Sequence, residues 1–377
     1  MKKKFIIVTT IPDSLSFFKG QLNILNQSFN VTAVSSGIDK LQKIALEEKI
    51  GVKSISMQRN ISILNDLISL FHFVVYFYRE KPFIVHGNTP KASMLSLVAA
   101  YLLKVPHRIY MCHGLRYQST TGFECHLLKM MERITCRCAT DIYAVSNGVA
   151  TTLHNDGITK KDVSVKLGGS SNGIDLDYYS HHLSFELNRI REHLGINEGD
   201  FVYIFLGRLV RDKGINELIE AFVKLAGIKS NIKLLIAGPK EDCSSITAQA
   251  IWELEHNSQI IYAGFQSDIR PLLALSNILV LPSYREGLGM VLLEAGAMNI
   301  PCIASDIIGC NDVIVENVNG LLIKPRNVDS LFIAMKRLLE DEQLRTQIIQ
   351  STRASIAQRF EQKKIWHEFI SSYLDMK

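Results

Sequence analysis

The stretch that decides the fold of this chain is YREGLGMVLLEA at residues 284–295. It follows the apolar run ILVL at 278–281, a pattern typical of a buried parallel strand, which Pro282 ends. Gly287 and Gly289 then let the backbone approach a ligand closely, and the helix that begins there directs amide N–H groups towards it. A strand, a glycine-rich turn and a helix in this order predict an α/β protein with an anion site at the turn.

Two glutamates, Glu286 and Glu294, stand on either side of this turn. We expect Glu286 to face a bound group from the loop. Glu294 lies a little over one turn into the helix, where it can accept a hydrogen bond from a hydroxyl such as a ribose OH. Glutamates at this spacing also occur on solvated helix faces, so the meaning of the pair depends on the motifs around it.

A second strand, loop and helix lie upstream. The apolar run FVYIFL at 201–206 is followed by GRLVRDKG at 207–214 and by a helical pattern at 215–225. This order is typical of the first βα unit of a doubly wound sheet, whose ligands bind at the carboxyl ends of the strands. Arg208 and Lys213 lie on that loop and would offset two phosphate charges without a metal. The loop matches neither the P-loop nor the dinucleotide glycine motif.

Together these motifs resemble the sugar-nucleotide signature of the retaining GT-B glycosyltransferases of the family 4 type (glycosyl transferases group 1), in particular those of bacterial surface-polysaccharide synthesis. The segment SNGID at 171–175 resembles the interdomain linker of that family, and NGLLI at 319–323 also matches. The resemblance is strong from about residue 171 to 325. It implies that nine residues bind the nucleotide sugar: Gly207, Gly238, Gly264, Phe265, Gly287, Leu288, Gly289, Met290 and Glu294. Without the resemblance, Gly238 and Gly264 are equally well explained as ordinary strand-end glycines.

Two histidines of the N-terminal half follow apolar strands, His86 in FIVHG and His113 in IYMCHG. An isolated histidine in such a position is more often structural. The resemblance identifies His113 with the histidine of the family that lies in the cleft beside donor sugar and acceptor, and it implies catalytic roles for His113, Arg208, Lys213 and Glu286. We interpret His86 as a structural residue.

The sequence departs from the family at residues 11–20, IPDSLSFFKG, where many relatives carry a Gly-Gly loop that contacts the diphosphate and acceptor. Only Gly20 and the backbone near Phe18 and Lys19 are available as substitutes. We therefore expect Gly20 and Arg116 on the acceptor side, with contacts that cannot be transferred in detail from the family.

Composition is consistent with a globular protein of two domains. The 377 residues are 47% hydrophobic and 21% charged, and the seven cysteines are an odd number without a Cys-x-x-Cys pair. Reduced thiols are therefore expected, with neither disulfides nor a bound metal. Residues 1–13 predict a first strand rather than a signal peptide, and the apolar stretches 61–78 and 92–103 are too short or too polar to span a membrane.

Charge is divided unevenly along the chain. Residues 1–175 carry 21 Lys and Arg against 12 Asp and Glu, whereas the rest of the chain carries 21 against 25. The basic half indicates an anionic partner, and without an RNA-binding signature a membrane surface or a diphosphate acceptor is favoured over nucleic acid. Residues 127–137, LLKMMERITCR, predict an amphipathic helix that lies on a membrane or packs on its own domain. Both alternatives remain open.

The sequence thus predicts two doubly wound, Rossmann-like domains facing across a cleft. Residues 1–172 would bind the acceptor, residues 173–353 would bind the sugar nucleotide, and residues 354–377 would cross back to the first domain. The expected enzyme moves a hexose or N-acetylhexosamine from a nucleotide sugar, preferably UDP-linked, to a lipid-linked or glycan acceptor with retention, in the cytoplasm or at the inner face of the membrane. It would need no metal or other cofactor. The alternatives are a sugar-nucleotide epimerase or hydrolase on the same fold and a non-catalytic sugar-nucleotide-binding subunit.

Overall fold

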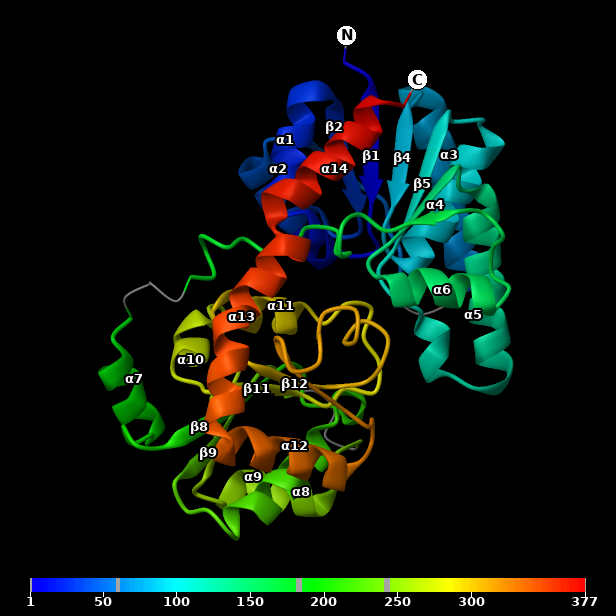
Figure 1. Cartoon of the computed structure of the whole chain (residues 1–377). Helices are drawn as coiled ribbons and strands as arrows, with labels where there is room; N and C mark the ends of the chain where they lie inside the picture. The colour runs from blue at the N-terminus through cyan, green and yellow to red at the C-terminus, as the bar shows by residue number, and fades with distance from the viewer. Residues whose placement is uncertain (1, 59–61, 181–184, 241–244, 377) are drawn as a thin grey trace. The chain divides into compact units, whose positions relative to one another are not determined.

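The computed structural model describes residues 2–58, 62–180, 185–240 and 245–376, so that Cys243 lies outside the described residues. The chain forms two compact units, each with its own sheet (Figure 1). The first comprises Met1–Gly173 and Gln362–Lys377, and the second comprises Ile174–Glu361. The C-terminal segment of the first unit therefore begins at Gln362, and residues 354–360 belong to a helix of the second unit.

The first unit is built on a parallel sheet with the strand order β3-β2-β1-β4-β5-β6-β7 in the described part of the chain. Its strands are β1 Lys4–Val8, β2 Asn30–Ser35, β3 Gly51–Ser54, β4 Ile84–Gly87, β5 His107–Cys112, β6 Asp141–Ala144 and β7 Val163–Ser164. The strand predicted near the N-terminus is confirmed as β1, whose apolar residues are buried. The chain order reverses between β1 and β4, and such a reversal is where doubly wound sheets bind ligands.

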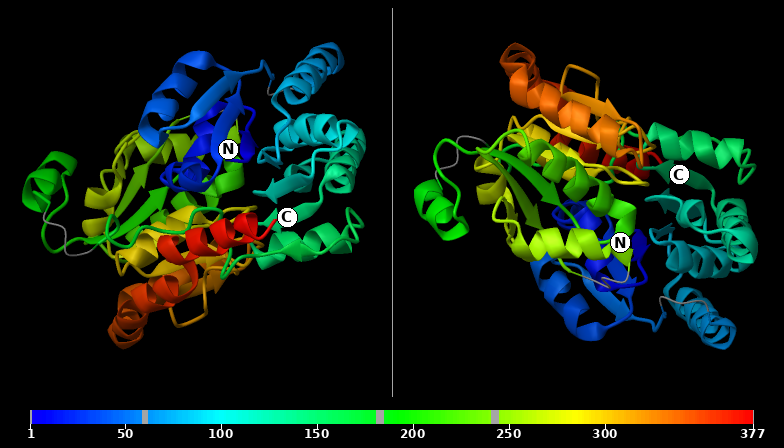
Figure 2. Two further views of the ribbon diagram at one scale, coloured as in Figure 1. Left: turned by 90° about the horizontal axis from the view of Figure 1, so that it is seen from above. Right: turned by 90° about the horizontal axis from the view of Figure 1, so that it is seen from below.

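Helices cover both faces of this sheet (Figures 1 and 2). They are α1 Gln21–Ser28, α2 Ile38–Glu48, α3 Ile63–Glu80, α4 Pro90–Leu102, α5 Gly122–Cys138, α6 Asn147–Asn155 and α14 Gln362–Leu374, with short 3₁₀ turns η1 Pro12–Phe18 and η2 Arg116–Ser119. Helix α4 packs between α3 and α5, and α14 contacts α1. The buried residues Ile365, Phe369 and Tyr373 make α14 part of the first unit's core.

The second unit has the sheet order β10-β9-β8-β11-β12-β13, again all parallel among the described strands. Its strands are β8 Phe201–Leu206, β9 Ile232–Ala237, β10 Ile260–Tyr262, β11 Ile278–Leu281, β12 Cys302–Ser305 and β13 Gly320–Ile323. The two strands predicted from apolar runs, β8 and β11, are neighbours at the point where the chain order reverses. The loops that follow them, which carry the predicted motifs, therefore lie at the ligand-binding edge of this sheet.

The helices of the second unit are α7 Leu187–Leu194, α8 Ile215–Ala226, α9 Ala248–His256, α10 Arg270–Ala274, α11 Met290–Ala297, α12 Val328–Glu340 and α13 Glu342–Phe360, with the 3₁₀ turn η3 Arg211–Lys213. Helices α8 and α12 pack together and share a core with the sheet, which includes Tyr203, Phe205 and Phe222. The loops that carry the two motifs lie between strands and helices packed in this apolar core, so they are held on rigid elements.

The amphipathic helix predicted at 127–137 lies within α5. Leu128, Met131 and Cys136 are buried and the helix packs on α4, whereas Met130 and Ile134 are exposed. Packing on its own domain is therefore observed for the buried residues of α5, and the membrane alternative stays a prediction. No helix among the described residues is long and apolar enough to cross a membrane.

Candidate functional site

The loops after β8 and β11 meet through their backbones. The amide of Tyr284 donates a hydrogen bond of 2.9 Å to the carbonyl oxygen of Asp212. Gly214 has a φ of +71°, and a Cβ at this position would lie 2.1 Å from the carbonyl oxygen of Pro282. Only glycine therefore allows the end of the β8 loop to approach the end of β11 this closely.

Lys213 and Glu286 form an ion pair that joins these two loops. Lys213 Nζ lies 2.5 Å from Glu286 Oε1, and the two side chains are only 22% and 13% exposed. The structure thus brings together two predicted catalytic residues that are 73 positions apart in the sequence. In so sheltered a place the lysine charge acts more strongly on a bound anion than it would in water.

The turn that contains Glu286 is supported by a loop that sequence reasoning missed. The Gly289 amide donates to the carbonyl of Gly309 (3.1 Å), and the Gly309 amide donates to Asp312 Oδ2 (3.0 Å). A Cβ at Gly309 would lie 2.7 Å from the carbonyl oxygen of Gly287. The expectation of a free amide at Gly289 is therefore wrong, because a neighbouring carbonyl already occupies it. Leu288 is buried beside it, and Met290 begins α11.

Glu294, in α11, accepts a hydrogen bond of 3.1 Å from the hydroxyl of Tyr179. Burial raises the pKa of Glu294 to about 7, and the Tyr179 hydrogen bond opposes that shift. Arg353 of α13 fixes the segment that carries the tyrosine, because it donates to the carbonyls of Leu176 (2.7 Å) and Tyr179 (2.8 Å). Nothing in the local sequence around Tyr179 indicates this contact, since its partners come from distant parts of the chain.

Three predicted glycines form a backbone row at the ends of β8, β9 and β10. The Gly207 amide donates to the carbonyl of Ala237 (3.0 Å), and the Gly238 amide donates to that of Gly264 (2.9 Å). Gly238 has a φ of +147°, and a Cβ there would lie 1.8 Å from the Gly207 carbonyl oxygen. Glycine is thus required at Gly238 for the close approach of the strand ends, whereas a Cβ at Gly264 would meet no atom within 4 Å.

The remaining predicted residues of this edge are accessible from solvent. Phe265, directly after Gly264, is 71% exposed, which is unusual for a side chain of its size. Arg208 is also exposed, on the loop that follows β8. An exposed aromatic ring and an exposed guanidinium at the carboxyl edge of the sheet can contact a base and a phosphate.

In the first unit, His113 follows β5 and lies among aromatic rings. Its ring stacks on Phe17 at a centroid distance of 4.6 Å and meets Phe18 edge-on at 5.9 Å. Burial lowers the pKa of His113 to about 3, so the imidazole is neutral at physiological pH. Its Nε2 is buried and has no hydrogen-bond partner in the described part of the chain. A buried polar atom without a partner indicates a place for a ligand group.

His86 at the end of β4 has a different environment. Its Nε2 lies 3.0 Å from the hydroxyl oxygen of Tyr373 in α14, within hydrogen-bond distance, and the side chain is fully buried. Burial, with a smaller effect of nearby His113, lowers the pKa of His86 to about 3. Nδ1 of His86, like Nε2 of His113, is buried and has no hydrogen-bond partner among the described residues, so the structural interpretation of His86 stays a prediction.

The two residues predicted on the acceptor side differ in their surroundings. Gly20 has a φ of +81°, and a Cβ there would lie 2.7 Å from the Trp366 ring of α14. Its amide donates to Glu48 Oε1 at 2.6 Å, so this amide is not available to a substrate. Arg116 begins η2 and is exposed. The prediction of an acceptor contact thus gains no support at Gly20 and stays open at Arg116.

Comparison with known proteins gives matches over both halves of the chain. The family model of glycosyl transferases group 1 matches residues 187–355, and the model of glycosyltransferase family 4 matches residues 25–178. The capsular polysaccharide biosynthesis glycosyltransferase CapM of Staphylococcus aureus is 32% identical over 98% of this chain and 97% of its own length. A UDP-Gal:alpha-D-GlcNAc-diphosphoundecaprenol alpha-1,3-galactosyltransferase of Escherichia coli is 28% identical over 84% of this chain and 82% of its own.

Among solved structures, HepE of Anabaena in complex with UDP and glucose superposes with a TM-score of 0.82. The likeness covers 99% of both chains at 19% sequence identity, so it shows the fold alone. The two parallel sheets with their flanking helices and the full-length relationship to CapM lead to one conclusion. The chain belongs to the family 4 glycosyltransferases and has the GT-B fold.

Proposed function

We propose that this glycosyltransferase moves a hexose or N-acetylhexosamine from a UDP-sugar to a lipid-linked sugar diphosphate, with retention of anomeric configuration, in surface-polysaccharide synthesis. The Lys213–Glu286 pair at the strand-order reversal carries the proposal. The relatives support the substrate classes, because one is named for capsule synthesis and another for transfer from UDP-Gal to a diphosphoundecaprenol-linked sugar. We assign the sugar nucleotide to the second unit and the acceptor to the first.

The chemical demand of this reaction is charge that develops on the departing diphosphate. Lys213 and Arg208 would stabilise that charge from the loop after β8, together with the start of α11. These groups supply the positive charge that a metal would otherwise provide, so we expect transfer to continue in EDTA. Among the described residues no group of three or more His, Cys, Asp or Glu side chains could hold a metal ion.

Retention would follow from attack on the same face that the phosphate leaves, with a phosphate oxygen taking the acceptor proton. Glu286 then orients hydroxyls of the donor sugar, and its ion pair with Lys213 holds the carboxylate in place. Glu294 would hold the ribose, and the unpartnered Nε2 of neutral His113 would bind a substrate hydroxyl in the first unit. Nucleotide sugars and lipid-linked acceptors together indicate action at the cytoplasmic face of a membrane.

The experiment is a calorimetric screen of UDP-, GDP-, ADP- and dTDP-sugars in EDTA, followed by transfer assays with a short-chain lipid diphosphate sugar. We expect binding of a UDP-sugar, and loss of turnover by about 10²-fold or more in Lys213→Ala. Lys224→Ala is the matched control, because Lys224 also forms ion pairs in the second unit but lies on the exposed face of α8. Unchanged UDP affinity and turnover in Lys213→Ala would contradict the proposal.

The same assay separates the alternatives. An epimerase or hydrolase would convert the sugar nucleotide or release UDP without any acceptor, whereas a transferase releases UDP in proportion to product. A non-catalytic subunit would bind the sugar nucleotide and turn over none of it. NMR of the new glycosidic linkage then tests retention.

A further inference from the structure

Helix α3 of the first unit exposes an apolar face to solvent. Leu64 is 76% exposed and Phe71 is 64% exposed, although both are large apolar residues. The exposed apolar residues of this face are Ile63, Leu64, Leu67, Ile68 and Phe71. Their spacing places them on one side of the first two to three turns, whereas Phe73 and Phe77 are buried and the helix packs on α4. Figure 2 shows these turns of α3, beside the grey trace, at the periphery of the first unit.

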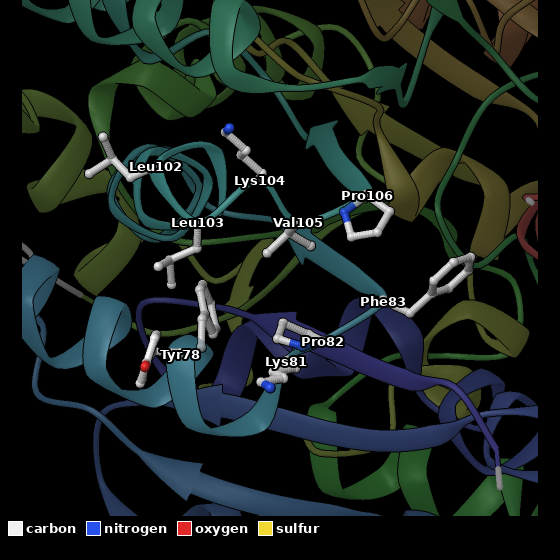
Figure 3. A pocket seen from close by; sticks show the side chains of 10 residues that line it. Tyr78, Lys81, Pro82, Phe83, Leu102, Leu103, Lys104, Val105 and Pro106 are labelled. Carbon is white, nitrogen blue, oxygen red and sulfur yellow. The ribbon is translucent and has the colours of Figure 1, made fainter.

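An apolar pocket adjoins the other end of the same helix (Figure 3). It has a volume of about 620 Å³ and lies where α3 and α4 end and β4 and β5 begin. Its lining residues include Tyr78, Phe83 and Leu102, with Lys81 and Lys104 on opposite sides in the view of Figure 3. Tyr78 and Leu102 are themselves largely exposed, so apolar surface is present at both ends of α3.

Positive charge surrounds this apolar surface. Lys3 lies over the Phe83 ring with its Nζ 3.8 Å from the centroid, and Arg79, Lys81 and Lys104 are exposed. The nearby acids are already neutralised within the described residues. Asp66 lies 2.7 Å from Lys91, and Glu80 lies 2.7 Å from Lys4. Part of the surplus of Lys and Arg in residues 1–175 therefore lies here, beside exposed apolar side chains.

We propose that the α3 face and the adjoining apolar pocket, with its lysines, form a docking surface for a bilayer that contains anionic lipid. An amphipathic helix with basic flanking residues lies in the membrane interface, where its apolar side enters the acyl boundary and its cations meet lipid phosphates. The proposal rests on the proposed function in one respect, namely that the acceptor is lipid-linked. The docking helix is then α3, because the five apolar residues of its face are each more than half exposed, whereas Leu128, Met131 and Cys136 of α5 are buried.

A bilayer fits this surface better than a second protein chain. Exposed apolar patches of this kind mark interaction sites, and a protein partner would need matching acids opposite the cations. Anionic lipid supplies negative charge and apolar contact at once, without a specific fold. Tyr78 stands between the apolar turns and the lysines, the position that aromatic residues take at a membrane boundary.

The test is flotation of the full chain with phosphatidylcholine vesicles, prepared with and without phosphatidylglycerol. We expect flotation that depends on phosphatidylglycerol and on low salt, and its loss in the triple variant Leu64→Ser, Leu67→Ser, Phe71→Ser. The matched control is Leu46→Ser with Phe123→Ser, two exposed apolar residues of the same unit outside this surface, which should leave flotation unchanged. Lys81→Glu with Lys104→Glu should remove the dependence on phosphatidylglycerol.

Two further measurements keep the outcomes distinct. UDP-sugar binding in solution should be unchanged in the triple variant, so a failure of flotation is not a failure of the proposed function. Equal flotation of the triple variant and the unaltered chain would overturn the proposal. Light scattering tests the alternative that the α3 face binds a second copy of this chain. If the unaltered chain is a dimer and the triple variant is a monomer, the face belongs to that second copy instead.

Discussion

The hydroxyl of Tyr179 lies 3.1 Å from Oε1 of Glu294, so the carboxyl that we assign to ribose binding already has a hydrogen-bond partner. Tyr179 belongs to the segment held by Arg353, and Glu294 belongs to α11. This contact stabilises the charged form of a carboxyl whose pKa burial raises to about 7. The affinity of the site for a ribose is therefore expected to depend on pH near neutrality.

Tyr179→Phe removes that donor and leaves the ring in place. The pKa of Glu294 should then rise further, so that less carboxylate is present at pH 7 to accept from ribose hydroxyls. We expect UDP-sugar affinity at pH 7 to fall by about tenfold, the effect of one hydrogen bond to a charged group. Calorimetry from pH 6 to pH 9 provides the check, and affinity should recover towards pH 9. A pH-independent loss would mean that Tyr179 contacts the ligand itself.

Gly309→Ala tests the support of the Glu286 turn. A Cβ there would lie 2.7 Å from the Gly287 carbonyl oxygen, and the φ of +83° is unfavourable for alanine. We expect weaker UDP-sugar binding in a protein that still folds. Gly195→Ala is the matched control, since its φ of +65° is also positive and no atom lies within 4 Å of the added carbon. Equal affinities in the two variants would contradict a role of Gly309 in supporting the Glu286 turn.

His113 and His86 should respond differently to replacement. His113→Phe retains stacking on Phe17 and removes a nitrogen that has no partner, so we expect unchanged stability and a large loss of turnover. His86→Phe leaves the Tyr373 hydroxyl without its partner in the core and should cost about 1–3 kcal/mol of stability. Urea unfolding and transfer assays on both variants make the comparison. Full activity in His113→Phe would restrict that residue to packing.

Glu132 gives a prediction for stability against pH. It accepts a hydrogen bond of 2.6 Å from Tyr110, and burial raises its pKa from 4.5 to about 7. A carboxyl whose folded pKa is raised favours the folded state below pH 4.5, and this contribution is lost as the pH rises through 7. Glu132→Gln keeps an acceptor for Tyr110, so it should raise stability at pH 8 by on the order of 3 kcal/mol and leave it little changed at pH 4. Urea midpoints at both pH values test this, and equal midpoints at pH 8 would contradict it.

The sequence predicted the parts of the fold and site that leave a local signal. The apolar runs that became β8 and β11 and the glycine-rich turns after them could be located because strands and turns impose their own residue types. The family resemblance added the grouping of Lys213 with Glu286, which no local rule contains. The parts that were missed depend on contacts between distant residues. Examples are Tyr179 on Glu294 and Gly309 against Gly287.

The pattern of apolar residues in the sequence also did not decide which helix faces are buried. The segments 61–78 and 127–137 are both apolar on one side in the sequence, and only the packing of α4 determines which side is covered. Helix α5 buries Leu128 and Met131 and leaves Met130 partly exposed, whereas α3 exposes all five apolar residues of the face on its first turns. The boundary near residue 354 was misplaced for a similar reason, because α13 continues to Phe360 with unbroken helical sequence.

The position of α14 has a consequence for folding of the chain during its synthesis. The first unit places Ile365, Phe369 and Tyr373 in its core, yet the ribosome makes these residues only after the whole of Ile174–Glu361. The second unit is continuous in the chain and can fold as soon as it emerges from the ribosome. The first unit cannot complete its core until α14 has been made, and until then His86 and Gly20 lack their contacts with that helix. The half of the protein that is synthesised first is therefore the half that is completed last.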